Sequence, residues 1–195
     1  MELFDVADIV CKTVYFEKLG PENTEETLKL AKKRAEELGI RNIVVSSSTG
    51  ETGVKASEVF KGYNLIVVSH VTGFRKPDFQ EFLPKNRNTI QNNGAKTLTT
   101  AHAFGTLGRA VKNKFGTIQV DEIVSTVLRL FGQGVKVACE ISCMAADAGL
   151  IKTCEEAVAI GGTSSGVDTA IVLKPTNTHA FFDLIIKEIV CKPRL

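Results

Sequence analysis

Small hydroxyl and glycine residues follow an apolar run near the start of the chain. The apolar residues 43–45 are typical of a buried strand, and residues 46–53 that follow read Ser-Ser-Ser-Thr-Gly-Glu-Thr-Gly. A helical pattern then resumes at Val54. A strand that ends in a small polar loop at a helix N-terminus brings backbone N–H groups together, and the helix dipole adds partial positive charge. The segment therefore predicts a phosphate cradle formed by Ser47, Ser48, Thr49, Gly50, Thr52 and Gly53.

Three further loops of similar composition follow apolar runs later in the chain. They are residues 69–74 with His70, Thr72, Gly73 and Phe74, residues 100–105 with His102 and Phe104, and residues 161–168 with Gly162, Thr163, Ser164 and Asp168. In an open α/β sheet, ligands bind beyond the carboxyl ends of the strands. Each loop alone could be a tight turn, but hydroxyls and glycines at four strand ends suit the binding of phosphate and polyol groups. We interpret them as walls of one ligand site, although neither a GxGxxG fingerprint nor a P-loop is present.

Several of these side chains have two interpretations, which the sequence leaves open. Asp168 can accept a hydrogen bond from a sugar hydroxyl or ring N–H, or it can hold its own loop by bonding backbone amides. Phe74 and Phe104 can stack on a planar ring or pack beneath their loops. His70 and His102 are the loop histidines that could transfer a proton. We take His102 as the candidate catalytic residue, the alternative being a hydrogen-bonded structural histidine.

Apolar runs alternate with amphipathic stretches over the first hundred residues. They predict strands at 13–16, 42–46, 65–68 and 96–99, separated by helices at 24–38, at 52–60 and within 79–93. We expect Asn23 to cap the helix at 24–38 and Gly39 to end it. Near-continuous apolar strands separated by amphipathic helices indicate a parallel sheet covered on both faces.

The pattern changes after residue 100. Helices are predicted at 106–114, 119–131 and 134–149, and strands at 157–160, 169–173 and 184–191. The spacing between the first two of these strands is too short for a helical crossover, so we expect some late strands to be antiparallel. No linker divides the chain, and we predict a single α/β domain over residues 1–195.

Composition and charge exclude several classes of function. The net charge is +2 with scattered basic residues, and the densest basic run, residues 32–34, is followed at once by Glu36 and Glu37. We therefore expect a solvated helix face there and no nucleic-acid partner. No apolar run approaches the roughly 20 residues needed to cross a bilayer, so we expect no membrane partner.

Five cysteines, an odd number without a CxxC motif, indicate free thiols in a reducing compartment. Because the chain begins with the acidic, interrupted stretch 1–5, we expect no signal sequence and a cytoplasmic location. Cys139 and Cys143 lie four residues apart, so they would share one helix face. Without a supporting histidine or a second cysteine pair, we interpret them as buried packing residues and predict no metal site.

The residues around the four loops resemble those of a known family. Residues 42–60 and 63–74 resemble the carboxyl-terminal α/β domain of pyruvate kinase, in which a Ser/Thr/Gly loop opens a helix and holds the phosphate of a sugar-phosphate effector. Over nearly its full length the chain is more similar to a group of stand-alone, mostly archaeal proteins of that fold. The shared motifs are Ser47-Ser48-Thr49-Gly50, Thr100-Ala101-His102-Ala103-Phe104, Gly161-Gly162-Thr163 with Gly166 and Asp168-Thr169, and Phe181-Phe182-Asp183-Leu184.

This resemblance implies a three-layer α/β/α fold and bound flavin mononucleotide (FMN), with no established reaction. It does not imply pyruvate kinase activity, because the catalytic barrel of that enzyme cannot fit in the chain. The pyruvate kinase loop usually carries a basic residue after its glycine, whereas Glu51 follows Gly50 here, which favours a ligand with a single phosphate.

Our first hypothesis is an FMN-binding protein, with an enzymatic reaction left open. The alternatives are a regulatory module for another phosphorylated metabolite, such as a sugar phosphate, and a structural subunit without a small ligand. The sequence leaves the subunit count open, a homo-oligomer included. We further expect Gly50→Val to abolish phosphate binding and leave the fold largely intact.

Overall fold

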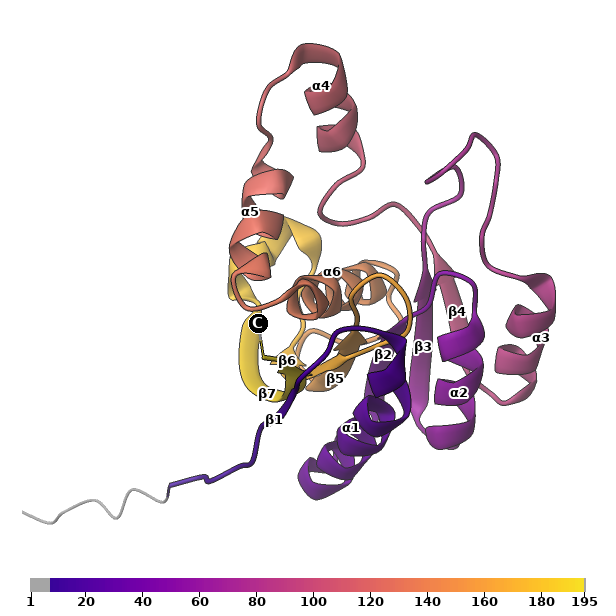
Figure 1. Ribbon diagram of the computed structural model, residues 1–195, viewed down its shortest axis with the longest axis vertical. Helices are drawn as coiled ribbons and strands as arrows, with labels where there is room; N and C mark the ends of the chain where they lie inside the picture. The colour runs from indigo at the N-terminus through magenta and orange to yellow at the C-terminus, as the bar shows by residue number, and fades with distance from the viewer. Residues whose placement is uncertain (1–7, 195) are drawn as a thin grey trace, which may run out of the picture.

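The computed structural model describes residues 8–194, which form one seven-stranded sheet (Figure 1). The strands are β1 (Val14–Phe16), β2 (Asn42–Ser46), β3 (Asn64–Ser69), β4 (Lys96–Thr99), β5 (Ala157–Gly161), β6 (Thr169–Lys174) and β7 (Ile185–Pro193). Their order is β1-β7-β6-β5-β2-β3-β4, and β6 runs antiparallel to both of its neighbours whereas the other pairs are parallel. The prediction of a mostly parallel sheet with late antiparallel pairing is confirmed.

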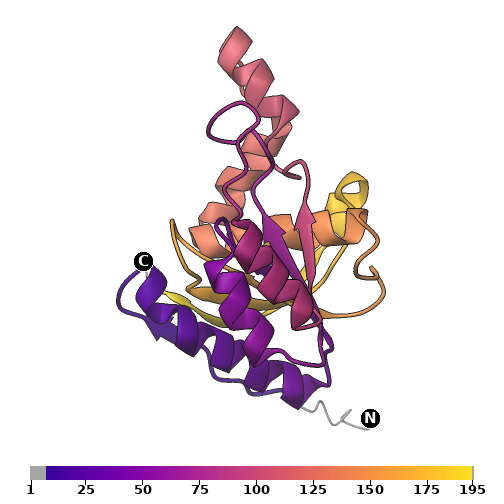
Figure 2. The same ribbon diagram turned by 90° about the vertical axis from the view of Figure 1, so that its right-hand side faces the viewer.

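Helices cover both faces of this sheet. They are α1 (Thr24–Leu38), α2 (Glu51–Val59), α3 (Pro84–Asn92), α4 (Leu107–Phe115), α5 (Val120–Arg129) and α6 (Gln133–Asp147), with short 3-10 helices η1 (Pro21–Asn23) and η2 (Thr178–Asp183). Figure 2 shows α1, α2 and α3 in front of the sheet and α6 on its other side, which is the three-layer α/β/α fold expected from the sequence. No helix within residues 8–194 is long and apolar enough to span a membrane.

The central strands β2, β3, β5 and β6 are almost continuously apolar because their alternate side chains enter two different hydrophobic cores. In β2, Ile43 and Val45 pack in the core beneath α1, α2 and α3, whereas Val44 packs in the core beneath α6. Successive side chains of a strand point to opposite faces, so a strand covered on both sides must be apolar at every position. The two cores fix the strand ends from which the four polar loops emerge.

Helix α6 approaches the sheet closely enough to touch it with its backbone. A Cβ atom added to Gly161 would lie 2.3 Å from the carbonyl oxygen of Gly134, which is a forbidden distance. Gly161, the first glycine of the motif at 161–168, therefore permits close packing of α6 on the sheet. This contact holds the start of the loop that follows β5 against the N-terminus of α6.

The start of α1 corrects one expectation. The side chain of Asn23 makes no capping bond to the helix, and its Nδ2 donates instead to the carbonyl oxygen of Lys18 at 2.8 Å. The reason is that η1 runs directly into α1, so Asn23 already has helical backbone angles and its side chain turns back. Gly39, at φ +67°, ends α1 as expected.

Helix α4 stands away from the rest of the molecule, and α5 returns from it to α6 (Figure 1). We call residues 107–131, which contain both helices, the arm. No residue of α4 is buried, and Ser125 is the one buried residue of α5. The loop between β3 and α3 extends on the same side of the molecule (Figures 1 and 2).

Candidate functional site

Two adjoining cavities lie where β2, β3, β4 and β5 end. One has a volume of about 390 Å³ and the other about 250 Å³, and both are lined by Ser46, Ser47, Ser48, His70, Gln133 and Val137. We call the pair the cleft. Its position beyond the carboxyl ends of parallel strands is the usual ligand position of an α/β sheet. Its size falls within the range of small-molecule sites.

The cleft gathers only part of the predicted set. The predicted residues that line it are Ser47, Ser48, Thr49, Thr52, His102, Gly162 and Ser164. The predicted residues outside its lining are Gly50, Gly53, Thr72, Gly73, Phe104, Thr163 and Asp168. The four loops therefore meet at the cleft. About half of the predicted residues belong to these loops without lining the cleft.

The loop after β2 combines exposed hydroxyls with a buried brace. The N–H group of Gly53 donates to the Oγ atom of buried Ser47 at 3.1 Å, so this serine fixes the first turn of α2. The N–H groups of Glu51 and Thr52 begin the helix and have no intrahelical acceptor. Amides of this kind, with the hydroxyls of Ser48 and Thr49 beside them, can bind an anionic oxygen.

Gly50 precedes α2 at φ +93°, a left-handed conformation that favours glycine. A Cβ atom there would also lie 2.7 Å from the Cβ atom of Asn86 in α3. The expectation that Gly50→Val leaves the fold largely intact is therefore wrong, since the valine would be strained and would push α2 away from α3.

A chain of polar contacts runs along one wall of the cleft. The Oγ atom of Ser48 lies 3.3 Å from Nε2 of His70, and Nδ1 of His70 lies 2.8 Å from a carboxylate oxygen of Glu81. The second carboxylate oxygen of Glu81 pairs with Arg75 at 2.8 Å. A hydroxyl, an imidazole and a carboxylate in this order can move a proton from the hydroxyl, or can fix it as a donor to a ligand. The sequence singled out Ser48 and His70 but missed Glu81 and Arg75.

His102 links the loops after β3 and β4. Its Nε2 atom accepts a hydrogen bond from the N–H group of Val71 at 3.3 Å. Burial lowers the pKa of His102 below its ordinary value of 6.5, which keeps the imidazole neutral and able to accept this bond. His102 also lines the smaller cavity, so its side chain serves the loop and faces the cleft.

Phe74 lies against the two histidines. Its ring centroid is 4.4 Å from that of His70 and 5.2 Å from that of His102. The guanidinium carbon of Arg109 lies 5.2 Å from the same ring. Phe74 is partly exposed and lines the smaller cavity, which is consistent with its interpretation as a ring-stacking residue.

Phe104 and Asp168 fit the structural interpretations. Phe104 is 6% exposed and packs edge to face on Phe181, with centroids 5.1 Å apart. Asp168 is fully buried, and its carboxylate accepts bonds from the N–H group of Gly20 at 3.2 Å and the hydroxyl of Thr169 at 2.9 Å. Asp168 therefore ties the loop after β5 to the chain before α1.

Thr72 and Gly73 organise their own loop. The hydroxyl of Thr72 accepts a bond from Gln80 at 3.1 Å, and the N–H group of Gly73 donates to the carbonyl oxygen of Phe79 at 3.0 Å. These bonds fold the segment 70–83 back on itself. The fold-back carries Glu81 to His70.

Basic side chains from separate elements surround the cleft. Arg75 comes from the loop after β3, Arg109 from α4, Arg129 from α5 and Lys136 from α6. Lys136 is buried and pairs with Glu140 at 2.5 Å, whose other oxygen accepts the N–H group of Phe104. Basic residues that are scattered along the sequence thus lie together around the cleft. Their even distribution in the sequence gave no sign of this cluster.

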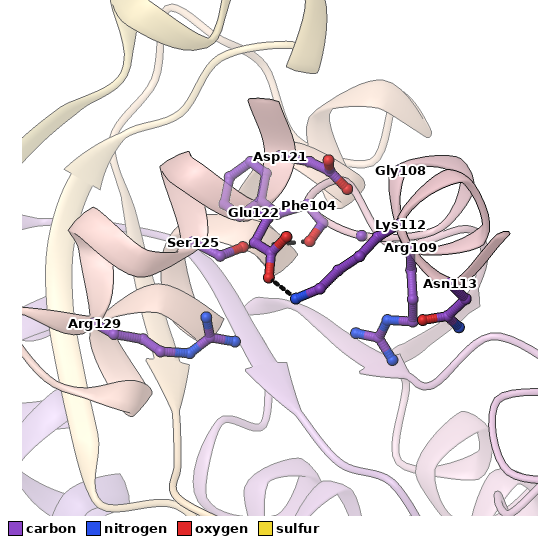
Figure 3. A pocket seen from close by; sticks show the side chains of 10 residues that line it. Phe104, Gly108, Arg109, Lys112, Asn113, Asp121, Glu122, Ser125 and Arg129 are labelled. Atoms are coloured by element: carbon purple, nitrogen blue, oxygen red, sulfur yellow. Dashed lines mark hydrogen bonds and ion pairs between the residues drawn. The ribbon is translucent and has the colours of Figure 1, made fainter. Parts of the chain in front are cut away.

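The arm contains a cavity of its own, of about 300 Å³ (Figure 3). Arg109 from α4 and Arg129 from α5 reach toward the same space in it, and Lys112 and Glu122 form an ion pair between the two helices. Both arginines also line the smaller cavity of the cleft. The position of the arm therefore determines which positive charges the cleft contains.

The cysteines take no part in the cleft. Cys11, Cys139, Cys143, Cys154 and Cys191 are free thiols. Burial raises the pKa of Cys139 and of Cys143 to about 12, which suits packing residues. Residues 8–194 contain no group of three or more His, Cys, Asp or Glu side chains that could hold a metal ion.

Two comparisons found known proteins that this chain is similar to. A family model described as "Pyruvate kinase, alpha/beta domain" matches residues 25–173. Among solved structures, a pyruvate kinase from Cryptosporidium parvum is similar, with a TM-score of 0.42 and 14% sequence identity over 78% of this chain. The match covers 23% of that pyruvate kinase, so the chain spans less than a quarter of its length.

Proposed function

This chain belongs to the pyruvate kinase alpha/beta domain family, and from that premise we propose that it binds a phosphorylated small molecule, with FMN as the ligand. The observation that carries the proposal is the cleft, into which the hydroxyl loop at the N-terminus of α2 opens. The free amides and the dipole of a helix N-terminus favour an anion there. Pyruvate kinase activity itself is not part of the proposal.

The two halves of the cleft suit the two ends of FMN. The larger cavity is lined by hydroxyl groups and glycine, which suits a phosphate and a polyol chain. The smaller cavity contains Phe74, Ile141 and Met144 beside the histidines, which suits a planar ring. Glu51 also lines the larger cavity, and its charge favours a ligand with one phosphate over one with two.

In this proposal Ser48, Thr49, Thr52 and the first-turn amides of α2 bind the phosphate, and Gly162 and Ser164 face the polyol chain. His70 fixes the hydroxyl of Ser48, while Arg109 and Arg129 add positive charge. Bound flavin would supply redox chemistry, for which His102 is the candidate proton-transferring residue.

The test is the visible spectrum of the purified protein, followed by titration with FMN. We expect a flavin spectrum or saturable uptake. Thr49→Val keeps the backbone carbonyl that accepts the N–H group of Leu83 and removes only the hydroxyl. It should weaken binding about tenfold or more, because a hydrogen bond to a charged group contributes roughly 1.5–3 kcal/mol. Thr153→Val, at an exposed position before β5, is the matched control and should bind as the wild type does. A colourless protein that takes up no FMN would overturn the proposal.

The second candidate is a regulatory module for another phosphorylated metabolite. The observation that favours it is the phosphate loop itself, because amides and hydroxyls recognise the phosphate and not the group attached to it. Thermal-shift measurements separate the two candidates. Stabilisation by a sugar phosphate and not by FMN would favour the regulatory module.

A further inference from the structure

The arm leaves apolar side chains in solvent on both of its helices. They are Leu107, Phe115, Ile118, Val120, Ile123, Val127, Leu130 and Phe131, and exposed Phe182 of η2 shares a groove with Leu107 and Val120. Side chains of this size expose together on the order of 1,000 Å² of apolar surface. Monomeric proteins rarely leave so large an apolar patch uncovered.

Helix α4 of the arm lacks the packing that keeps short helices folded, whereas α5 packs on the core through Val124 and Leu128. Helix α4 has nine residues and none of them is buried. Helices shorter than about 12–15 residues are marginal in water without tertiary contacts. A surface that covers the arm would therefore stabilise α4 beyond its contacts with α5.

Three exposed residues of α5, together with Leu130 directly after its last residue, point to the partner. Val120, Ile123, Val127 and Leu130 follow each other at spacings of three, four and three residues, which is the a/d spacing of a coiled coil. Val120 is 75% exposed and Leu130 is 80% exposed, and Ile123 and Val127 between them are about half exposed, so the stripe is open to solvent along its length. In this stripe Val120 and Val127 occupy the a positions, and Ile123 and Leu130 occupy the d positions. Such a stripe packs against a helix with the same pattern, and β-branched residues at a with a leucine at d favour pairs.

A second copy of the chain supplies such a helix. The stripe can pack against the same stripe of the second copy about a twofold axis. In such an interface both copies contribute the same residues. Beside the stripe, a groove of about 470 Å³ between α4, α5 and η2 is lined by Leu107, Val111, Val124 and Phe181, and it can receive apolar side chains of the other copy. The available apolar area also meets the roughly 800 Å² per partner that a stable interface needs.

We propose that the arm pairs with the arm of a second copy through α5, and that this pairing holds Arg109 and Arg129 at the cleft. The second half rests on the proposed function. Both arginines line the smaller cavity, and Arg109 lies over Phe74. An arm that is covered by a second copy keeps these cations in place, whereas a frayed arm withdraws them.

Analytical ultracentrifugation over a range of concentrations tests the pairing. We expect the wild type to be a dimer, or a larger assembly built on this pair. Val127→Glu should give monomers, because it places a charge in the middle of the stripe at a position that its own chain leaves half exposed. Leu38→Glu, at an exposed helical leucine of α1, is the matched control and should assemble as the wild type does. A monomeric wild type, or a Val127→Glu variant that assembles unchanged with a native circular dichroism spectrum, would overturn the proposal.

Titration of the same variants with FMN tests the coupling. We expect Val127→Glu to bind FMN at least about tenfold more weakly than Leu38→Glu does. Monomers that bind FMN with unchanged affinity would overturn the coupling and leave the pairing intact. If no variant binds FMN, the proposed ligand is wrong, and the ultracentrifugation result still decides the pairing.

Discussion

At the scale of single residues, the cleft depends on an imidazole that must stay neutral. His102 accepts the N–H group of Val71 through Nε2, and a protonated ring could not accept this bond. Burial lowers the pKa of His102 in the folded protein below the ordinary value of 6.5. Protons therefore bind more tightly to His102 in the unfolded chain, and acid favours unfolding at this position.

This shift predicts a pH-dependent stability. The contribution of His102 is fully present above about pH 6.5 and is lost as the pH falls through the lower folded pKa. His102→Gln supplies an amide that does not titrate, so the variant should lose less stability than the wild type between pH 7 and 5. Urea unfolding at both pH values measures the difference. Equal losses in the two proteins would show that His102 does not titrate across folding.

Residue types alone revealed part of this wall. Ser48 and His70 stand in loops that the sequence marked, because hydroxyls and histidine after apolar runs carry a recognisable signal. Glu81 stands in a segment without periodicity, and only the fold-back of residues 70–83 brings it to His70. Asp168 and Phe104 stand in the same polar loops as the residues that line the cleft, so the sequence cannot tell the two groups apart. Only their burial in the structure distinguishes them.

At the scale of elements, periodicity predicted nearly every helix and strand. Helix 24–38 and strands 42–46 and 96–99 have the expected bounds, since amphipathic spacing, Gly39 and polar loops mark their ends. The order of strands could not be predicted in the same way. β5 lies beside β2, and β7 lies beside β1, through contacts between residues more than a hundred positions apart.

One ion pair joins α1, near the start of the chain, to β7, near its end, and its contribution to stability can be tested. Arg34 of α1 donates through Nε and Nη2 to the two carboxylate oxygens of Glu188 in β7, both at 2.7 Å. The hydrogen bonds to Arg34 lower the pKa of Glu188. Both side chains are largely buried, so the forked geometry contributes more than a surface pair does.

Arg34→Met should therefore lower the free energy of unfolding by about 1–3 kcal/mol. Lys29→Met removes the exposed pair with Glu26 on the same helix and should change it by less than about 0.5 kcal/mol. Urea unfolding near neutral pH measures both. Equal effects of the two substitutions would mean that α1 is held on β7 by apolar packing alone.

At the scale of the whole molecule, the arm differs from the rest of the fold, which we call the body. The body contains two hydrophobic cores, whereas the helices of the arm contain one buried residue between them. Ile43, Val44 and Val45 of β2 are fully buried between helical layers, whereas α4 has no buried residue. The body should open only by global unfolding, and the arm should open locally unless a second copy covers it. In this proposal the strand ends that line the cleft are rigid, whereas the order of Arg109 and Arg129 from the arm depends on assembly.

Hydrogen exchange should report this division directly. Amides of β2 should exchange slowly at every protein concentration, because their hydrogen bonds lie between two cores. Amides of α4 should be protected at high concentration and should exchange quickly on dilution, since mass action removes the second copy. In Val127→Glu they should exchange quickly throughout. If α4 exchanges as slowly as β2 in a monomeric protein, the arm is stable by itself, and the positive charges of the cleft do not depend on assembly.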